Sequence, residues 1–579
     1  MSHYRKAATS PTGFPSSRIV VTRNWARCSE KHDPSQTLEA YRVAIKLLSE
    51  YVVMNETVEG RQAGIKLVSG LASGAAAAAF TRGEIELGLE WLEQGRCIVW
   101  TQLDQLRAPF KEHIAKHPKI KVKLERLQRV SEQLEMLGSR DIGLAADTEK
   151  ASLEEEIIEH VKYVKEYNQL LEDIGHSGME NFLRPRKTVD ILSKLPQNGL
   201  VVLINVYEDQ GHALPLRHNV PLAAISLKRV SQKWAKGLRS QLEACISPHT
   251  GVGGPVDLEK EKPLSVRFIL RALWVDLVRP IFDAVGYRVR SFLRIKTERL
   301  TVLITIQNRP ESLHRIWWCV TGSLAFLPIH AAGLYGTKSG LTVCTSDFAI
   351  SSYIPNISTL LDNGRKISEE APHILLVSQA EALDMPVILG VNEETDKLRK
   401  FMKGHGLSVQ CLSGNDATVG NVIKEMPSIH WVHLACHATQ EPLLPLTSTF
   451  HLLDGQLSLS DIIKLKIPDA DLAFLSACET STGDKQLSDE AVHLAAGMLA
   501  AGCRSVVSTM WSIRDSRATD VAESFYSYLL NRAEEEGKSW PDSSGAAHAI
   551  HHAIQCLRKS LGDKNRSLLT WVPYVHFGI

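Results

Sequence analysis

The chain has 579 residues, of which 44% are hydrophobic, and its 66 basic residues almost balance its 65 acidic residues. A chain of this length and hydrophobic content can bury more than one core, so we expect a globular protein of several domains. The near-zero net charge excludes a global electrostatic attraction to nucleic acid or to an anionic membrane, and we expect neither as a partner.

The N-terminal segment 1–17 lacks the apolar core of a secretory signal, and no later stretch approaches the ~20 uncharged apolar residues that span a bilayer. The ten cysteines are scattered without a CxxC pair, which argues against a disulfide framework and against a cysteine-rich zinc site. We therefore expect an intracellular, cytoplasmic protein with reduced thiols, no metal and no other cofactor.

Residues 1–110 are predicted to form helical repeats. Apolar residues share one helical face in the segment 37–48, and Ala76, Gly83 and Gly88 match small-residue positions of a tetratricopeptide repeat (TPR), with a turn at Gly83. Alanine-rich helical hairpins of another kind would give a similar pattern. Because such repeats need about three neighbours to bury a continuous core, the two visible here suggest a truncated array.

Residues 111–184 are predicted to form a long helical hairpin. In its second half, apolar residues keep a spacing of three and four among interleaved charges, which are typical of a solvated helix face. These apolar residues are Leu153, Ile157, Val161, Val164, Leu171 and Ile174.

Residues 185–365 are predicted to be a mixed α/β region, with a strand at "GLVVLINVYE" and a helix at "LSVRFILRALWVDLVRPIFDAV". From residue 366 to 579, short apolar strands alternate with amphipathic helices, which is typical of βαβ units and a parallel sheet covered on both faces. The first four strands are expected at "HILLVSQ", "LSVQCL", "HWVHLAC" and "DLAFLSAC".

Two reactive residues follow such strands. His437 comes directly after "WVHLAC" and Cys478 ends "DLAFLSAC". Ligands of an open parallel sheet bind beyond the carboxyl ends of its strands, and neighbouring strands lie ~4.8 Å apart, so a thiol and an imidazole there could share one cleft. Such a pair is the minimum apparatus for cysteine acyl transfer.

Each of these residues also has a simpler interpretation. A lone cysteine at the end of an apolar strand is usually a small core residue. His433 and Cys436 lie within the apolar strand, and we interpret them as buried packing residues. A zinc site made of His433, Cys436 and His437 is disfavoured because strand alternation sends residues 433 and 436 to opposite faces.

The stretches "HLACHATQ", "FLSACETSTGD" and "LSDEAVHLAAGMLAAGCRSVVSTMWSIRD" together resemble the CHAT domain, the caspase-like peptidase module found attached to TPRs. Supporting stretches are "GSLAFLPIHAAGLYG", "SSYIPNISTLL" and "MPVILGVNEE". The resemblance covers roughly residues 185–579. The wording of "LSDEAVHLAAGM" and "MWSIRD" is similar to that of fungal members, which implies a fungal protein of the TPR-CHAT type.

The resemblance implies a fold and a catalytic dyad. The fold would be a caspase-like α/β domain, a mostly parallel sheet of order 2-1-3-4 flanked by helices, after an all-α TPR-like region. Residues 366–579 would be its catalytic half, and 185–365 a degenerate companion half. His437 would be the general base, Cys478 the nucleophile, and the backbone N–H groups of Ala438 and Cys478 the oxyanion hole.

The family usually has glycine after the base, where this chain has Ala438. If the position needs a positive φ, its Cβ costs on the order of 1 kcal/mol. By analogy with related peptidases, the substrate pocket would draw on Gln379, Ser476, Trp511 and Asp515. An acidic Asp515 there would favour Arg or Lys before the scissile bond. Alternatively, Asp515 caps the helix that follows it.

Two functions follow from this pattern. The first is a cysteine-type endopeptidase, a hydrolase of the caspase/separase-like class, which cleaves a protein substrate when a regulatory protein binds its helical repeats. The second is a weakly active or inactive CHAT scaffold that serves as a protein–protein interaction module. The intact His437 and Cys478 favour the endopeptidase, whereas Ala438 and the short repeat array are compatible with the scaffold.

Overall fold

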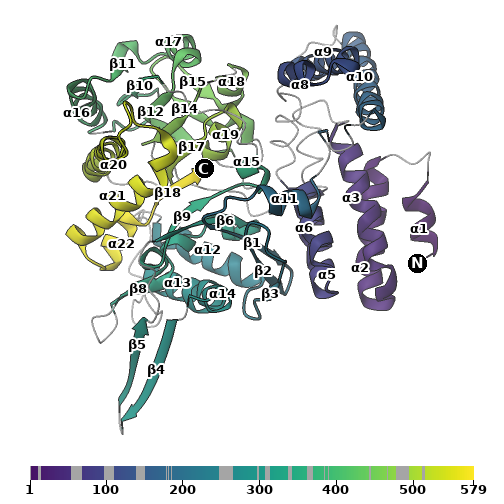
Figure 1. Cartoon of the computed structure of the whole chain (residues 1–579), viewed down its shortest axis with the longest axis horizontal. Helices are drawn as coiled ribbons and strands as arrows, with labels where there is room; N and C mark the ends of the chain where they lie inside the picture. Colours follow the sequence, from purple (N-terminus) through teal and green to yellow (C-terminus); the bar gives the residue numbers. More distant parts are fainter. Residues whose placement is uncertain are drawn as a thin grey trace, which may run out of the picture. The chain divides into compact units, whose positions relative to one another are not determined.

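The computed structural model of the chain (Figure 1) describes residues 2–10, 15–53, 68–96, 110–138, 150–177, 179, 182–183, 186–246, 265–287, 289–296, 299–306, 313–336, 342–361, 370–383, 385–388, 390–441, 445–465, 467, 469–476, 494–511 and 515–579. The chain divides into a helical unit, Met1–Ser193, and an α/β unit that contains the described residues from Lys194 onward. The finer division of the chain that the sequence suggests stays a prediction.

The described part of the helical unit is built from the following helices: α1 (Ser2–Ala8), α2 (Pro15–His32), α3 (Thr37–Val53), α5 (Leu71–Thr81), α6 (Ile85–Gly95), α8 (Phe110–Lys116), α9 (Lys121–Gly138), α10 (Lys150–His176) and α11 (Thr188–Lys194). Helices α2 and α3 pack as one pair and α5 and α6 as another, while α9 packs along α10. The all-helical N-terminal region is therefore confirmed, while its division into repeats and a long hairpin, and its descent from TPRs, stay predictions.

Small residues set the close approach of α5 and α6. Gly83 makes the turn between them with φ of +80°, a conformation that costs little only without a Cβ. A Cβ on Gly88 would lie 2.4 Å from Cε1 of the Phe80 ring. At two of the positions that the repeat pattern singles out, Gly83 and Gly88, these helices therefore need glycine.

The α/β unit is organised by a main sheet that has 11 strands among the described residues. In spatial order they are β11 (Ser408–Ser413), β10 (His373–Ser378), β12 (Trp431–Ala435), β16 (Leu472–Leu475), β17 (Ser505–Thr509), β18 (Tyr574–Gly578), β9 (Ala349–Tyr353), β6 (His314–Val320), β1 (Leu200–Tyr207), β2 (Gln210–Leu216) and β3 (Ile225–Ser226). The first four are the strands expected from the sequence, in parallel pairing and in the order 2-1-3-4. The caspase-like fold and its sheet order are confirmed.

Helices and smaller ribbons complete this unit. The helices are α12 (Gln232–Ile246), α13 (Val266–Ala272), α14 (Arg279–Val285), α15 (Ser358–Leu361), α16 (Val391–Gly404), α17 (Val419–Glu425), α18 (Leu459–Lys464), α19 (Leu494–Ala501), α20 (Asp515–Glu535), α21 (Ala546–Leu561) and α22 (Asn565–Trp571). The ribbons are β13 (His437–Thr439) with β14 (Thr449–His451) and β15 (Gln456–Ser458), β4 (Val289–Lys296) with β5 (Arg299–Ile306), and β7 (Gly333–Leu334) with β8 (Val343–Cys344).

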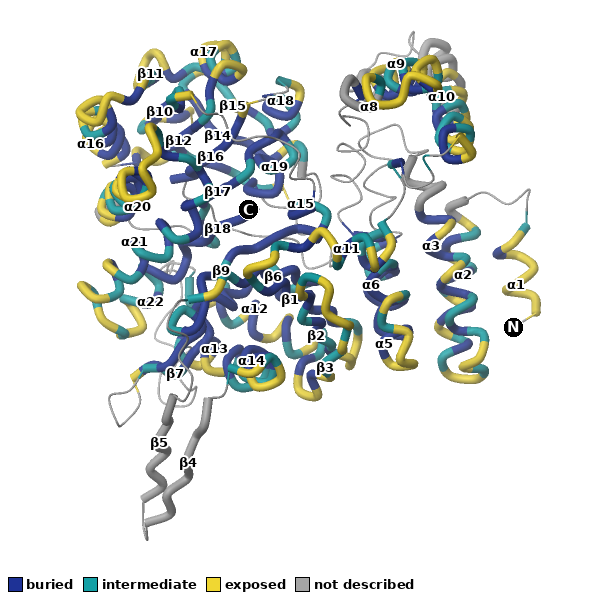
Figure 2. The backbone as a smooth tube through the Cα atoms, in the orientation of Figure 1, coloured by how far each residue is buried: buried dark blue, intermediate teal, exposed yellow. Residues whose placement is uncertain are grey.

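The sheet is covered on both faces. Helix α20 packs between α16 and α21 on one face, whereas α18 and α19 pack against each other. Because parallel crossovers are right-handed, α18 and α19, which lead the chain from β12 to β17, lie on the face opposite α16, which leads it from β10 to β11. The central strands are accordingly dark blue, or buried, along their length in Figure 2.

One predicted helix contains a distortion. The segment 266–285 is helical throughout, but Leu273–Val278 forms a π-helical turn between α13 and α14. Pro280, near the start of α14, has no backbone N–H to donate to the preceding turn. In this wider turn the N–H of Arg279 donates to the carbonyl of Trp274, five residues earlier, and the helix continues past the proline.

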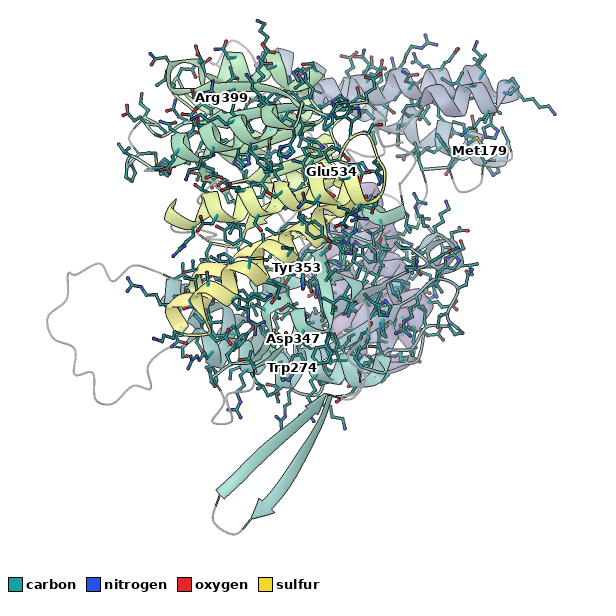
Figure 3. All side chains as sticks on the ribbon, turned by 60° about the vertical axis from the view of Figure 1, so that its left-hand side comes forward. Met179, Trp274, Asp347, Tyr353, Arg399 and Glu534 are labelled. Carbon is teal, nitrogen blue, oxygen red and sulfur yellow. The ribbon has the colours of Figure 1, made fainter. Side chains whose placement is uncertain are left out.

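The sequence analysis missed strand β18, which joins the two halves of the sheet. It pairs antiparallel with β17 on one side and parallel with β9 on the other. Tyr353, labelled in Figure 3 beside the C-terminal helices, is the β9 residue that pairs with Phe577 of β18. The predicted companion half therefore shares one continuous sheet with the predicted catalytic half.

Candidate active site

Three parallel strands that precede residues singled out in the sequence end at one edge of the sheet. Strands β10, β12 and β16 are parallel neighbours, with Ser378 opposite Ala435 and Leu434 opposite Leu475. Their carboxyl ends therefore point the same way, and the segments that follow them emerge side by side.

His437 is held at this edge by a backbone carbonyl. It begins strand β13, its side chain is half-buried, and its Nε2 lies 2.6 Å from the carbonyl oxygen of Pro386. A carbonyl can only accept a hydrogen bond, so Nε2 carries the proton, and Nδ1 of the neutral ring keeps the lone pair. This orientation leaves Nδ1 as the nitrogen that can act as a base.

A second histidine lies across the ribbon from His437. His451 of β14 is the register partner of His437, and its Nε2 lies 2.7 Å from Oγ1 of Thr439. Burial lowers the pKa of His451, and the neighbouring His437 lowers it further. His451 was not recognised in the sequence because only the antiparallel pairing of β13 with β14 brings it to the site.

Ala438 takes an ordinary strand conformation. It lies in β13 opposite Phe450, is 8% exposed, and is not among the described non-glycine residues with a positive φ. The penalty that we attached to a Cβ at this position required a positive φ. Ala438 therefore carries no such backbone cost in this conformation.

Cys478 lies outside the described residues. The register of the strands before it is defined, however. Leu434 of β12 pairs with Leu475 of β16, and each of His437 and Cys478 comes three residues after its member of this pair. The two residues thus follow neighbouring strands at the same offset.

Three of the four residues expected in the substrate pocket are buried and hydrogen-bonded. The Gln379 amide donates to the Gly414 carbonyl, and its Oε1 accepts the N–H of Glu381. Trp511 donates to the Leu569 carbonyl at 3.1 Å. Helix α20 begins at Asp515, whose side chain is outside the described part of the chain.

The third buried pocket candidate, Ser476, belongs to a cluster that the sequence analysis did not recognise. Its Oγ donates to Oε2 of Glu394 at 3.2 Å, and Oε1 of the same carboxylate lies 3.0 Å from Nε2 of His433. His433 is fully buried, as the strand pattern predicts. The missed partner could have been sought because a histidine inside an apolar strand requires one.

The described residues contain no group of three or more His, Cys, Asp and Glu side chains arranged to hold a metal ion. In the part of the chain that the structure describes, no helix is both long and apolar enough to cross a membrane.

A comparison with protein families matches the CHAT domain to residues 269–579, which is more than half of the chain. Two crystal structures of the Saccharomyces cerevisiae separase–securin complex, at 3.0 and 2.6 Å resolution, are similar at 10% sequence identity, with TM-scores of 0.40 and 0.39. Each similarity covers 100% of this chain and 49% of the other, so this chain spans about half the length of the chains it matches. No curated protein sequence matches it.

Proposed function

Because this chain belongs to the CHAT domain family and has its caspase-like fold, we propose that it is a cysteine endopeptidase of the caspase/separase-like class. Its substrate would be a protein, and His437 and Cys478 would be its catalytic dyad. The observation that carries the proposal is the orientation of His437, whose Nε2 donates to Pro386 and whose Nδ1 is left as the base. The equal offset of His437 and Cys478 from the Leu434–Leu475 pair supports it.

The reaction would proceed in two stages. Nδ1 of His437 takes the proton of the Cys478 thiol, and the thiolate attacks the carbonyl carbon of the scissile peptide. The backbone N–H groups of Ala438 and Cys478 would bind the oxyanion that forms. When the C–N bond breaks, His437 returns the proton to the leaving amine, and an acyl-enzyme thioester remains.

In the second stage, His437 takes a proton from water, and the resulting hydroxide attacks the thioester carbonyl. The C–S bond then breaks, the carboxylic acid leaves, and the proton returns to sulfur. The Pro386 carbonyl would stabilise the imidazolium form of His437 in both stages, because it accepts the hydrogen of Nε2 while the ring is charged.

A peptide-library cleavage assay of the full chain tests the proposal. The chain is compared with Cys478→Ala, with His437→Ala and with the control Cys556→Ala, which removes an exposed thiol. We expect both dyad variants to lose cleavage by at least about 10³-fold, as in other dyads and triads, and the control to retain it. Equal cleavage by the chain and by Cys478→Ala would refute the peptidase proposal and favour the binding scaffold.

For the residue before the scissile bond, we propose Arg or Lys, selected by the Asp515 carboxylate, while the buried Gln379, Ser476 and Trp511 would support the pocket from within the protein without binding the substrate side chain. A carboxylate in the pocket would form a charge-assisted hydrogen bond with either cation. In Asp515→Asn, kcat/KM for an arginine peptide should fall at least tenfold while kcat/KM for the matched norleucine peptide changes less than twofold. A uniform change for both peptides, with a lower melting temperature, would instead identify Asp515 as a helix cap.

We also propose that a protein bound to the helical unit controls the cleavage. The paired hairpins α2–α3 and α5–α6 support this, because stacked helical pairs form extended surfaces that bind other chains. A substitution on an exposed face of this unit, such as Lys46→Glu, should change stimulation by the partner without changing basal cleavage.

A further inference from the structure

Four buried polar side chains from separate elements meet beneath the carboxyl edge of β12 and β16. They are Tyr526 of α20, His433 of β12, Glu394 of α16 and Ser476, which follows β16. Nδ1 of His433 lies 3.3 Å from the Tyr526 hydroxyl, and its Nε2 lies 3.0 Å from Oε1 of Glu394. The other carboxylate oxygen accepts the Ser476 hydroxyl at 3.2 Å.

The hydrogen bonds of this cluster have one consistent direction. An ionised carboxylate only accepts, so His433 donates from Nε2 and Ser476 donates from Oγ. With Nε2 protonated in a neutral ring, Nδ1 of His433 accepts the Tyr526 hydroxyl. Burial, and then the Glu394 charge, raise the pKa of Tyr526 well above its ordinary value, which keeps this hydroxyl protonated.

The surroundings hold Glu394 and His433 in place. Glu394 lies in the first turn of α16, where the helix dipole favours a negative charge. The His433 ring stacks on Phe474 with 4.9 Å between centroids and 16° between planes. Because the ring is stacked and hydrogen-bonded at both nitrogens, it fixes the carboxylate through Oε1, the oxygen that Ser476 does not contact.

Burying a carboxylate costs desolvation free energy, and stability alone does not require one, because packed apolar residues often stabilise a core as well or better. Oε2 of Glu394 accepts a hydrogen bond from Ser476, the last described residue before Cys478. Ser476 comes two residues before the proposed nucleophile, at the point where the chain leaves the sheet. The Glu394 carboxylate therefore ties down the start of the segment that carries Cys478.

We infer that Glu394, oriented by His433, is a positioning residue that anchors the nucleophile-bearing segment through the hydroxyl of Ser476. This inference rests on the proposed function for its catalytic consequence only. The anchor sets where the chain leaves β16, two residues before Cys478, and in the proposed dyad a shift of this point would change the approach of the thiol to His437. A displacement of about 1 Å at a reacting atom is enough to lower the rate by about 10²-fold.

The experiment measures two properties of the full chain. The first is hydrogen–deuterium exchange of the backbone amides in the segment Leu472–Ser476, which is β16 and the residue that follows it. The second is kcat and KM for the best library peptide. The variants are Ser476→Ala, which removes the tether, Ser476→Thr, which restores a hydroxyl, and Glu394→Gln, which removes the charge at nearly constant volume. Ser505→Ala is the matched control, because it loses a buried serine hydrogen bond, to the Ile579 carbonyl, at the opposite edge of the sheet.

We expect Ser476→Ala and Glu394→Gln to raise exchange in this segment at least about tenfold, and to lower kcat about 10- to 100-fold with KM changed less than threefold. Ser476→Thr should recover most of kcat, and Ser505→Ala should change neither property. Unchanged exchange in Ser476→Ala would overturn the anchor whether or not the protein cleaves peptides. Raised exchange in a chain without Cys478-dependent cleavage would keep the anchor and reject the peptidase, so the two failures are distinct.

Discussion

His330 should make the α/β unit sensitive to acid. Its ring is buried, its Nε2 lies 2.8 Å from the Val572 carbonyl, and its Nδ1 lies 2.9 Å from the Tyr353 hydroxyl. The carbonyl accepts from Nε2, so the neutral ring accepts the Tyr353 hydroxyl at Nδ1. Protonation of Nδ1 would bury a charge and break this arrangement. Desolvation accordingly lowers the pKa of His330 from 6.5 to about 4.

The size of the effect follows from proton linkage. Because the folded pKa is depressed, the unfolded chain takes up the proton first as the pH falls. The stability from His330 is therefore fully present above pH 6.5 and is lost as the pH falls toward 4. For pKa values of about 4 folded and about 6.5 unfolded, the linkage relation gives a loss of about 1.8 kcal/mol between pH 7 and pH 5.

Urea unfolding of the full chain and of His330→Gln at pH 7 and pH 5, followed by tryptophan fluorescence, measures this loss. The variant keeps a donor for the Val572 carbonyl but cannot titrate, so its decrease in unfolding free energy between the two pH values should be smaller by about 1.8 kcal/mol. His314→Asn, at an exposed position, is the control and should keep the decrease of the unsubstituted chain. The reasoning fails if His330→Gln loses as much stability between the two pH values as the unsubstituted chain.

Three further predictions concern packing and reactivity. Gly88→Ala should destabilise the helical unit by about 1–3 kcal/mol in thermal unfolding, because the new Cβ would overlap the Phe80 ring. Gly237→Ala, with open space around its Cβ, should instead stabilise the protein by about 0.4–1 kcal/mol. Equal effects of the two substitutions would contradict the described packing of Gly88. Phe450→Ala should cost about 3–5 kcal/mol in urea unfolding, because the Phe450 ring, on β14 of the β13–β15 ribbon, is fully buried. A cost below about 1 kcal/mol would show that the ribbon is not packed as described. Burial raises the pKa of the Cys344 thiol to about 11. At pH 8, iodoacetamide should therefore label the exposed Cys556 long before Cys344, as followed by mass spectrometry. Labelling of Cys344 before Cys556 would refute this expectation.

The sheet around the candidate site could be predicted because its strands are short apolar runs separated by amphipathic helices. The four strands from "HILLVSQ" to "DLAFLSAC" were found by this alternation, and their spatial order followed from the resemblance. Strand β18 was missed for the opposite reason. Tyr574–Gly578 follows two helices at the end of the alternating block, and nothing local in five residues indicates a position between β17 and β9.

Among the side chains of the site, those with a local signal in the sequence were likewise predicted, and those without one were missed. His437 stood out because a reactive residue follows an apolar strand directly, and that is a local signal. Pro386, Glu394 and His451 were missed because each acts through a partner that is distant in the sequence. Glu394 lies 39 residues before His433 and 82 before Ser476, so only the folded chain brings these side chains together.

The position of β18 has a consequence for synthesis. A ribosome makes β9 and β17 well before it reaches residue 574, yet β18 is the strand that lies between them. Until it emerges, β17 and β9 each present an open edge to the solvent, and such edges pair readily with other chains. Nascent chains that stall before residue 574 should therefore need chaperones more than chains released after it.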